Sequence, residues 1–513
     1  MPASKRSKST TPQRIELDRQ TVAAEQPLQD GPLAEMVAED LSDTFCFAPG
    51  LGWLHWSGKV WDECSDVEVV EAVRVILRDF MTAEVHSGVG PERVKALSIV
   101  LNSGKIRAVA GLLKGVLQAD VDEFDTQYDL LNVANGVVDL QTGELLPHDP
   151  SYRFTKITRA AYDPKARSKY WRMALGALPR SEREWMKVRL GQALTGYPPS
   201  DDILPISRGT GSNGKSTFFD TIRFACGTFA AIVSDRILMA NAGDHPTELT
   251  DLRGLRIAVL EELPEGGRLN VKRLKDIIGT ESMTARKIRQ DTITWRSTHS
   301  PFVTTNYTPR VNETDHGTWR RLALVRFPFT FRKEGESLHG KLDRAGDPAL
   351  KNRTRSRVMQ RAALRWLVEG AMAWYAADRV LPSVPDSVAE ATREWRSQAD
   401  QVFAFATEFL VWDASRSILS SDLMEHFQAW LSRNGKPEWA GELIVERFGN
   451  HHLAQDHGVT KGKLRVKEGQ LSRPHTTGGP HIAGASRDVA SVVGKQLAQW
   501  FGVAWRDDDE EAS

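Results

Sequence analysis

Residues 209–217 read Gly-Thr-Gly-Ser-Asn-Gly-Lys-Ser-Thr. This stretch matches the pattern G-x-x-x-x-G-K-[ST] of a phosphate-binding loop. Its glycines let the backbone turn tightly, so that successive N–H groups converge on phosphate oxygens. Lys215 would supply a positive charge to the β- and γ-phosphates, and the Ser216 hydroxyl would ligate Mg²⁺. The apolar run 203–206 predicts a strand before the loop, and residues 218–225 predict a helix after it whose N-terminus faces the bound anion.

The composition limits where a partner could bind. At about 150 residues per domain, the 513-residue chain should form roughly three domains. Lysine plus arginine and aspartate plus glutamate both number 67, so a nucleic-acid site has to be a local basic patch. The three cysteines are far apart, which argues against a disulfide framework or a zinc site and fits a reducing cytoplasm. Because no apolar run approaches 18 residues and no signal peptide is seen, we expect a cytoplasmic protein without a membrane partner.

Two glutamates end the apolar segment 254–262. The run 257–260 is typical of a parallel strand that is buried on both faces. In a nucleotide hydrolase, one acid at such a strand end holds Mg²⁺ through water, and the next polarises the attacking water. We assign the first role to Glu261 and the second to Glu262. The alternative is an ordinary strand-to-loop junction with surface acids, but the position after a phosphate loop favours the catalytic interpretation.

A further strand is predicted for residues 302–306 and ends in Asn306. An amide at this place can hold the attacking water or touch the γ-phosphate, although an isolated Asn at a strand end is usually a turn residue. ATP and Mg²⁺ are therefore the expected cofactors. The residues expected to bind them are Gly209, Gly211, Ser212, Asn213, Gly214, Lys215, Ser216 and Thr217, with Glu261 at the metal.

A basic segment lies between the acid pair and Asn306. Residues 285–296 are predicted to form a hairpin, with β-type residues on both sides of a polar tip. Arg286, Lys287 and Arg289 make this end of the hairpin basic, so it could grip phosphates. The alternative is a hairpin whose charges are simply solvated.

Paired arginines precede the last apolar strand of this region. Arg320 and Arg321 stand before residues 322–327. They could project into a neighbouring subunit's site as arginine fingers. They could equally be local salt-bridge donors.

The order of these motifs resembles a superfamily 3 helicase of the AAA+ class. Upstream segments make the chain similar to the phage, plasmid and poxvirus primase–helicase family. They are Asn135-Gly136-Val137-Val138-Asp139-Leu140, Thr142-Gly143-Glu144, Tyr162-Asp163-Pro164 and Thr195-Gly196-Tyr197. The resemblance covers residues 125–335 well and the flanks more loosely.

The resemblance implies a role for each motif. Lys215, Ser216 and Glu261 would bind ATP–Mg²⁺, Glu262 would assist hydrolysis, and Asn306 matches the family's sensor residue. Members form rings, usually hexamers, that move along single-stranded DNA with 3′-to-5′ polarity, so single-stranded and forked DNA are the expected partners. The residues matched to the DNA-contacting hairpin are Arg289 and Lys287; the arginine-finger candidates are Arg321 first and Arg320 second.

The expected fold is α/β, with a P-loop ATPase core of AAA+ type built on a parallel sheet. The predicted boundaries run in chain order: a disordered polar tail at 1–34, a mostly helical N-terminal domain at 35–195, the ATPase core at 196–335, lid helices and a linker at 336–394, and a winged-helix-like domain with an acidic tail at 395–513.

The last domain contains a basic strand. Lys461, Lys463 and Arg465 alternate at period two, so they should share one face of a strand. Helices followed by such a strand suggest a winged-helix DNA binder, for which a replication origin is a candidate target. The alternative is a solvated edge strand that its lysines protect from pairing with other chains.

Three functions remain open from the sequence. The favoured one is an ATP-driven replicative DNA helicase of a phage or plasmid; the second is an origin-binding initiator whose ATPase does not unwind DNA. The third is a bifunctional primase–helicase, for which Asp120 and Asp122 would bind metals. These two acids follow a helical run rather than a strand, and the carboxylates and histidine of a primase domain are not seen, so primer synthesis is the least favoured.

Overall fold

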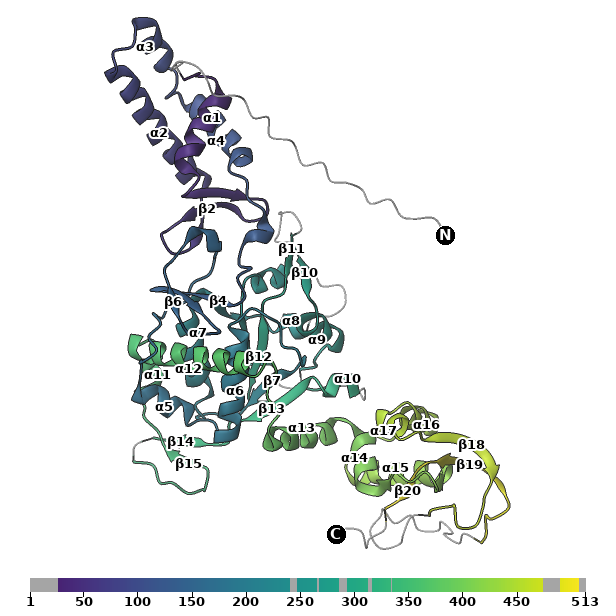
Figure 1. The fold of residues 1–513 in the computed structure, drawn as a ribbon. Coiled ribbons are helices and arrows are strands. Elements are labelled where there is room, and N and C mark those ends of the chain that lie inside the picture. Colours follow the sequence, from purple (N-terminus) through teal and green to yellow (C-terminus); the bar gives the residue numbers. More distant parts are fainter. Residues whose placement is uncertain are drawn as a thin grey trace, which may run out of the picture. The chain divides into compact units, whose positions relative to one another are not determined.

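The computed structural model describes residues 26–239, 247–264, 267–285, 293–311, 316–333, 335–473 and 490–506. The chain divides into two compact units, and Figure 1 shows its elements in sequence colours. One unit comprises Met1–Trp56 with Asp62–Val121, and the other comprises Ser57–Trp61 with Asp122–Ser513. The predicted boundary at residue 195 therefore lies inside the second unit.

The first unit is a helical bundle beside a three-stranded sheet of order β1-β2-β3. Its elements are α1 (Asp30–Leu41), β1 (Phe45–Ala48), β2 (Gly52–Trp56), β3 (Trp61–Cys64), α2 (Asp66–His86), α3 (Pro91–Leu97) and α4 (Ser103–Val116). Because α1 begins at Asp30, the stretch 30–34 is helical and does not belong to the polar tail assigned to 1–34. Residues 1–25 of that tail lie outside the described residues.

Helix α2 illustrates how local sequence shapes this unit. The Ser65 side chain accepts a hydrogen bond from the Glu68 backbone N–H, while the Glu68 carboxylate accepts one from the Ser65 N–H, which forms a capping box. Val69, Val73 and Leu77 then recur every four residues, and all three are buried in the core that α1, α2 and α4 share. The helical character expected for the start of the 35–195 region thus holds at α2.

The second unit is built on a five-stranded parallel sheet of order β13-β7-β12-β9-β8. Its strands are β7 (Leu204–Arg208), β8 (Ala230–Val233), β9 (Ile257–Glu261), β12 (Ser300–Thr305) and β13 (Leu322–Arg326). Along β9, Ile257 and Val259 belong to one hydrophobic core, while Ala258 and Leu260 belong to another. The sheet is therefore covered on both faces, as the unbroken apolar run predicted.

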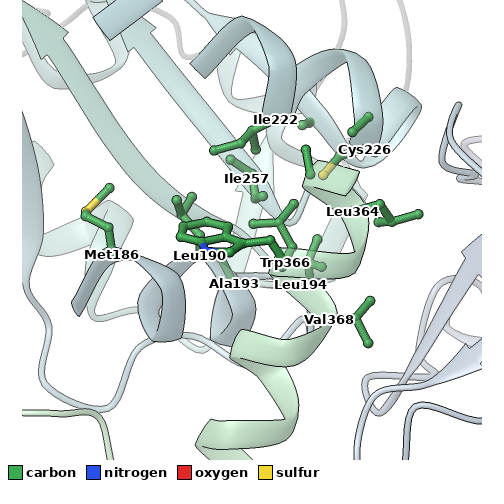
Figure 2. Packing of buried hydrophobic residues seen from close by; sticks show 14 of the residues in the cluster. Met186, Leu190, Ala193, Leu194, Ile222, Cys226, Ile257, Leu364, Trp366 and Val368 are labelled. Carbon is green, nitrogen blue, oxygen red and sulfur yellow. The ribbon is translucent and has the colours of Figure 1, made fainter. Parts of the chain in front are cut away.

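Residues 122–195 belong to this second unit because they pack against its helices. They form η1 (Val121–Glu123), β4 (Leu130–Val133), β5 (Gly136–Asp139), β6 (Leu145–Leu146), η2 (Pro150–Tyr152), α5 (Lys169–Leu175) and α6 (Arg180–Ala193). The core is completed by α7 (Lys215–Cys226) and α12 (Arg357–Ala376). Figure 2 shows Leu190 of α6, Ile257 of β9 and Trp366 of α12 meeting there.

The smaller elements of the unit connect these layers. They are η3 (Gly227–Phe229), α8 (Arg236–Met239), η4 (Thr247–Leu252), α9 (Val271–Ile278), β10 (Ser282–Ala285), β11 (Ile293–Arg296), α10 (His316–Trp319), β14 (Thr330–Arg332), β15 (Asp343–Ala345) and α11 (Leu350–Arg353). The C-terminal part contains α13 (Asp386–Ala399), α14 (Gln401–Phe409), β16 (Leu410–Val411), β17 (Ser417–Leu419), α15 (Ser420–Arg433), α16 (Gly441–Gly449), α17 (His452–Asp456), β18 (Thr460–Arg465), β19 (Gln496–Phe501) and β20 (Ala504–Trp505). Its winged-helix character stays a prediction, and the acidic tail from residue 507 lies outside the described residues.

Two glycines let α6 and α12 touch backbone to backbone. A Cβ on Gly191 would lie 2.2 Å from the Ala371 nitrogen, and one on Gly370 would lie 2.1 Å from the Lys187 carbonyl oxygen. Backbone atoms cannot swing aside as a flexible side chain can. The backbones of α6 and α12 therefore lie so close at this crossing that only glycine fits there.

We expect Gly370→Ala to lower the free energy of unfolding by about 2–3 kcal/mol, because overpacking of this kind outweighs alanine's better helix propensity. Gly111→Ala in α4 is the matched control, since its Cβ would meet nothing within 4 Å. That control should be neutral or stabilising by up to about 1 kcal/mol. Urea unfolding of both variants checks this, and equal midpoints would refute the tight crossing.

Candidate functional site

The phosphate-binding loop connects β7 to α7, as the sequence predicted. Gly214 has φ +78°, in the left-handed region that favours glycine, and a Cβ on Gly209 would lie 2.0 Å from the Asn213 side-chain nitrogen. Asn213 is buried, and its Oδ1 accepts a hydrogen bond of 3.1 Å from the Lys215 N–H. Asn213 therefore braces the loop from within.

The loop suits a bound anion. Among the described residues, the backbone N–H groups of 210–214 have no acceptor within the protein. Ser216 and Thr217 follow in the first turn of α7, with Ser216 exposed. Together with the Lys215 ammonium, these donors form a concave set that matches the oxygens of a phosphate chain.

Lys215 links two motifs that stand ninety residues apart. Its Nζ donates to the Thr305 carbonyl oxygen at 2.5 Å and to Asn306 Oδ1 at 3.1 Å. Burial lowers the pKa of Lys215 to about 8, while the nearby Glu262 and Glu261 carboxylates favour its charged form. The structure thus brings Asn306 to the loop lysine, because β12 lies directly beside β7.

The two acids end the next strand. Glu261 is the last residue of β9, and burial, followed by the nearness of Asp220, raises the pKa of its carboxyl group. Glu262 follows with φ +54°, and its N–H donates to the Thr304 carbonyl oxygen at 2.9 Å. A left-handed glutamate costs on the order of 1–2 kcal/mol, a strain of the kind that clusters at functional sites.

These groups share one edge of the sheet. The strands β7, β12 and β9 are neighbours and run parallel, so the loop, Asn306 and the acid pair all emerge at their carboxyl ends. Ligands of open parallel sheets bind at this edge. A phosphate on the loop would have an ammonium, an amide and two carboxylates around it.

A cavity of about 410 Å³ adjoins the loop. Ser212, Gly214 and Thr217 form one side of it, and the Phe331 backbone N–H donates to the Ser212 carbonyl oxygen at 2.8 Å. The apolar side chains of Met173, Phe331 and Leu350 line the rest. Its volume is in the range of small-molecule sites. The sequence did not predict that Met173, Phe331 and Leu350 would lie beside the loop, because they are far from it in the chain and belong to no motif.

The basic hairpin is present as two antiparallel strands. In β10 and β11, Ser282 pairs with Arg296 and Ala285 with Ile293. The hairpin itself is thus confirmed. The three residues expected to touch DNA, Arg286, Lys287 and Arg289, lie outside the described residues.

The paired arginines lie at the opposite edge of the sheet. Leu322 pairs with Leu204 at the amino ends of β13 and β7, so Arg320 and Arg321 are about 15 Å of strand away from the loop. The Arg321 guanidinium donates to the Gly317 carbonyl oxygen at 2.6 Å and pairs with Asp202 at 3.3 Å, whereas Arg320 is exposed. Within its own chain, Arg321 is thus a local salt-bridge donor.

The basic strand of the C-terminal part has the expected alternation. Lys461, Lys463 and Arg465 lie on β18, opposite Trp500, Ala498 and Gln496 of β19. All three cations are exposed, and β18 pairs with β19 alone in its sheet. This arrangement serves a DNA contact and a protected edge strand equally well.

Several motif residues behind the resemblance stabilise structure. Asn135 donates from Nδ2 to the Tyr162 carbonyl oxygen at 3.0 Å, and its Oδ1 accepts from the Tyr162 N–H at 2.8 Å. Asp139 accepts from the N–H groups of Gln141 and Thr142 and so closes the turn after β5. These residues fix the segment that precedes α5.

The acids considered for a polymerase site do not end a strand. Asp122 lies in the short helix η1, and Asp120 precedes it. Over the described ranges, no group of three or more His, Cys, Asp or Glu residues is arranged to hold a metal ion. Within the same part of the chain, no helix combines the length and apolar character needed to cross a membrane.

Two family models match parts of the chain. One described as "D5 N terminal like" matches residues 34–178, and one described as a family of unknown function matches residues 207–321. The first covers most of the expected N-terminal domain. The second covers the phosphate loop, the acid pair, Asn306 and both arginines.

Curated viral proteins match longer segments. "Putative helicase L207/L206" of Acanthamoeba polyphaga mimivirus is 25% identical over 340 residues, which are 63% of this chain and 35% of that protein. "Putative helicase 022R" of Frog virus 3 is 28% identical over 241 residues, 46% of this chain and 25% of that protein. "Putative primase C962R" of African swine fever virus (isolate Tick/Malawi/Lil 20-1/1983) is 26% identical over 223 residues, 41% of this chain and 23% of that protein. The matches thus span between 23% and 35% of these relatives' own lengths.

Among solved structures, "The A form apo structure of NrS-1 C terminal region-CTR" aligns with a TM-score of 0.45 at 12% identity, covering 83% of this chain and 86% of that one. The three viral relatives come from large DNA viruses. The phage or plasmid origin expected from the sequence stays a prediction.

Proposed function

We propose that this chain, a member of the superfamily 3 primase–helicase family, hydrolyses ATP and uses the free energy to separate DNA strands. One observation carries the proposal: Lys215 Nζ lies between the Thr305 carbonyl and Asn306 Oδ1, with the charges of both glutamates close enough to favour its ammonium form. The phosphate loop, the acid pair and Asn306, which follow three separate strands, thus lie close to one another. A parallel sheet that carries them on adjacent strands supports an AAA+ type core.

Each residue has a task in hydrolysis. The loop N–H groups and Lys215 would bind the β- and γ-phosphates, and Ser216 with Glu261 would hold Mg²⁺, which neutralises charge on those phosphates. Glu262 would orient the attacking water and take up its proton. Asn306 would hold the same water or a γ-phosphate oxygen. When the γ-phosphate leaves, Asn306 would lose that contact, and β12 could pass the change to the hairpin that precedes it in the chain.

A ring would complete the site. Arg320 and Arg321 lie too far from the phosphate loop of their own chain to touch its nucleotide. The same edge of the sheet could face the loop of an adjacent copy, and the exposed Arg320 could enter that site at no cost to existing contacts. We therefore propose a homo-oligomer, a hexamer by family resemblance, with sites shared between subunits.

Burial of Lys215 gives a pH-dependent prediction. In the empty site its pKa is about 8, and bound phosphates would favour the ammonium and raise that pKa. Binding should therefore take up most of a proton per site at pH 9 and clearly less at pH 7.5. Calorimetric titration with a non-hydrolysable ATP analogue, in buffers of different ionisation enthalpy, measures this uptake.

Lys215→Arg is the control, because its guanidinium stays charged over this pH range. Its uptake at pH 9 should vanish. An uptake at pH 9 that is equal in the wild type and the variant would show that another group titrates.

An unwinding assay on forked DNA tests the proposed function. We expect ATP-dependent strand separation from forks with a free 3′ tail and little from forks with only a 5′ tail. The competing function is an initiator whose ATPase does not unwind, and the exposed basic strand β18 is the observation that favours it. ATP hydrolysis with sequence-specific duplex binding and no strand separation would establish the initiator instead.

A further inference from the structure

The molecule carries a concentration of positive charge outside every motif described above. Residues 165–172 read Lys-Ala-Arg-Ser-Lys-Tyr-Trp-Arg, and residues 351–365 read Lys-Asn-Arg-Thr-Arg-Ser-Arg-Val-Met-Gln-Arg-Ala-Ala-Leu-Arg. Neither run contains an aspartate or a glutamate. In a chain whose formal net charge is zero, such a patch stands well above its surroundings.

The fold brings the two runs together. The Arg365 guanidinium donates to the Ala166 carbonyl oxygen at 3.1 Å, and the rings of Trp171 and Trp366 meet edge to face at 5.6 Å. A groove of about 640 Å³ lies between them, with Arg167, Lys169, Arg172 and Arg365 in its walls and Glu369 as the one acid among the described residues that line it. We call the following exposed cations of the two runs the basic face: Lys165, Arg167, Lys169, Arg172, Arg353, Arg355, Arg357 and Arg361.

These cations are not paired with acids. Among the described residues, no member of the basic face forms a salt bridge, whereas Arg365 pairs with Glu369 at 2.7 Å. Arg357 begins α12, where the helix dipole is positive and a cation is unfavourable. A bound anion would stabilise cations that are otherwise unfavourably placed.

The spacing of the face suits a polyanion of regular repeat. Arg357 and Arg361 are one helical turn apart on α12, roughly 6 Å along its axis, and both are exposed. Tyr170 is half-buried in the first run, and Lys169 Nζ and the Arg353 guanidinium each lie 5.1 Å from its ring. A cationic track with an aromatic ring is typical of single-stranded nucleic-acid sites, where unpaired bases stack.

We propose that the basic face binds the sugar–phosphate backbone of single-stranded DNA, at a place separate from the 285–296 hairpin. The inference deepens the proposed function by giving the DNA a second contact. Helix α5 also borders the cavity beside the phosphate loop through Met173 and Ala174, so a strand bound here touches the helix that a nucleotide would touch. Bound DNA is therefore expected to change the rate of hydrolysis.

The test compares double variants of the full chain without nucleotide. Arg357→Gln/Arg361→Gln and Lys169→Gln/Arg172→Gln each remove two cations from the basic face. Lys95→Gln/Arg107→Gln is the matched control, because it removes two exposed cations from the first unit. The probe is fluorescein-labelled (dT)30, and anisotropy gives Kd across a range of NaCl concentrations.

Each face variant should weaken Kd about tenfold and reduce the slope of log K against log [NaCl] by about 1.4, since each single-strand phosphate contact contributes about 0.7. The control should match the wild type. Thermal melting and DNA-free ATP hydrolysis, both unchanged, would show that the variants are folded.

Unaltered Kd and slope in both face variants would overturn the proposal. The proposal would also be overturned if the face variants changed the oligomeric state in mass photometry but left the salt slope unchanged. The basic face would then contact another copy of the chain. If the wild type binds DNA through the face but hydrolyses no ATP, the proposed motor function fails while the basic face stands. The two conclusions are thus separable.

Discussion

Lys215→Ala is expected to reduce ATP hydrolysis by about 10³-fold or more, because it removes the ammonium of the phosphate loop, which donates to Thr305 and Asn306. Fast phosphate-release kinetics at saturating Mg²⁺ and ATP measure the effect. The loss should appear mainly in kcat, since the lysine neutralises charge that develops as the γ-phosphate leaves. Unwinding should be lost with it.

The fold should survive this change. Burial already lowers the pKa of Lys215 to about 8, so the empty site holds an ammonium that would be better solvated in the unfolded chain. Below that pH the wild type bears this cost, and the alanine variant should melt at the same or a higher temperature. An active Lys215→Ala protein would mean that hydrolysis occurs elsewhere in the chain.

Glu262→Gln is expected to slow hydrolysis by about 10²–10⁴-fold while ATP binding is retained, because an amide fills the same space but cannot take up a proton. The residue is placed for this task by its position directly after β9 and its left-handed backbone at φ +54°. Single-turnover hydrolysis and analogue binding by calorimetry, measured on one sample, separate the two effects.

Glu261→Gln is the matched control. Glu261 ends the strand that Glu262 follows, and its substitution removes the same charge, but its assigned role is to hold Mg²⁺. Glu261→Gln should therefore reduce the gain in analogue affinity that Mg²⁺ provides, whereas Glu262→Gln should leave that gain intact. If the two variants exchange these behaviours, the roles of the glutamates are reversed; if neither slows hydrolysis, the acid pair is structural.

Much of the geometry of the candidate site could be predicted because its signals are local. The loop pattern, the apolar run before Glu261 and the strand before Asn306 each depend on a few consecutive residues. The same holds for α2, whose capping box and four-residue spacing fixed its start and its buried face. The contact between Asn306 and Lys215 depends on the order of the strands in the sheet. Local sequence does not give that order; only the family resemblance placed Asn306 at the nucleotide as a sensor residue.

Other features depend on contacts between distant segments, which no local pattern reveals. Residues 122–195 were assigned to the N-terminal domain, yet α6 packs on α12 through Gly191 and Gly370, nearly 180 residues apart. Strand register alone places Arg321 at the edge remote from its own phosphate loop. The basic face is formed by two runs that are far apart in the chain, and the chain's net charge of zero gives no sign of it.

The central claim is that the phosphate loop, Glu262 and Asn306 act on one nucleotide. A structure of the full chain with Mg²⁺ and a non-hydrolysable ATP analogue tests it most directly. We predict the γ-phosphate within hydrogen-bond distance of Lys215 Nζ, with Asn306 and Glu262 on either side of the position for the attacking water. A nucleotide bound away from the loop, or one whose γ-phosphate both residues fail to approach, would contradict the account.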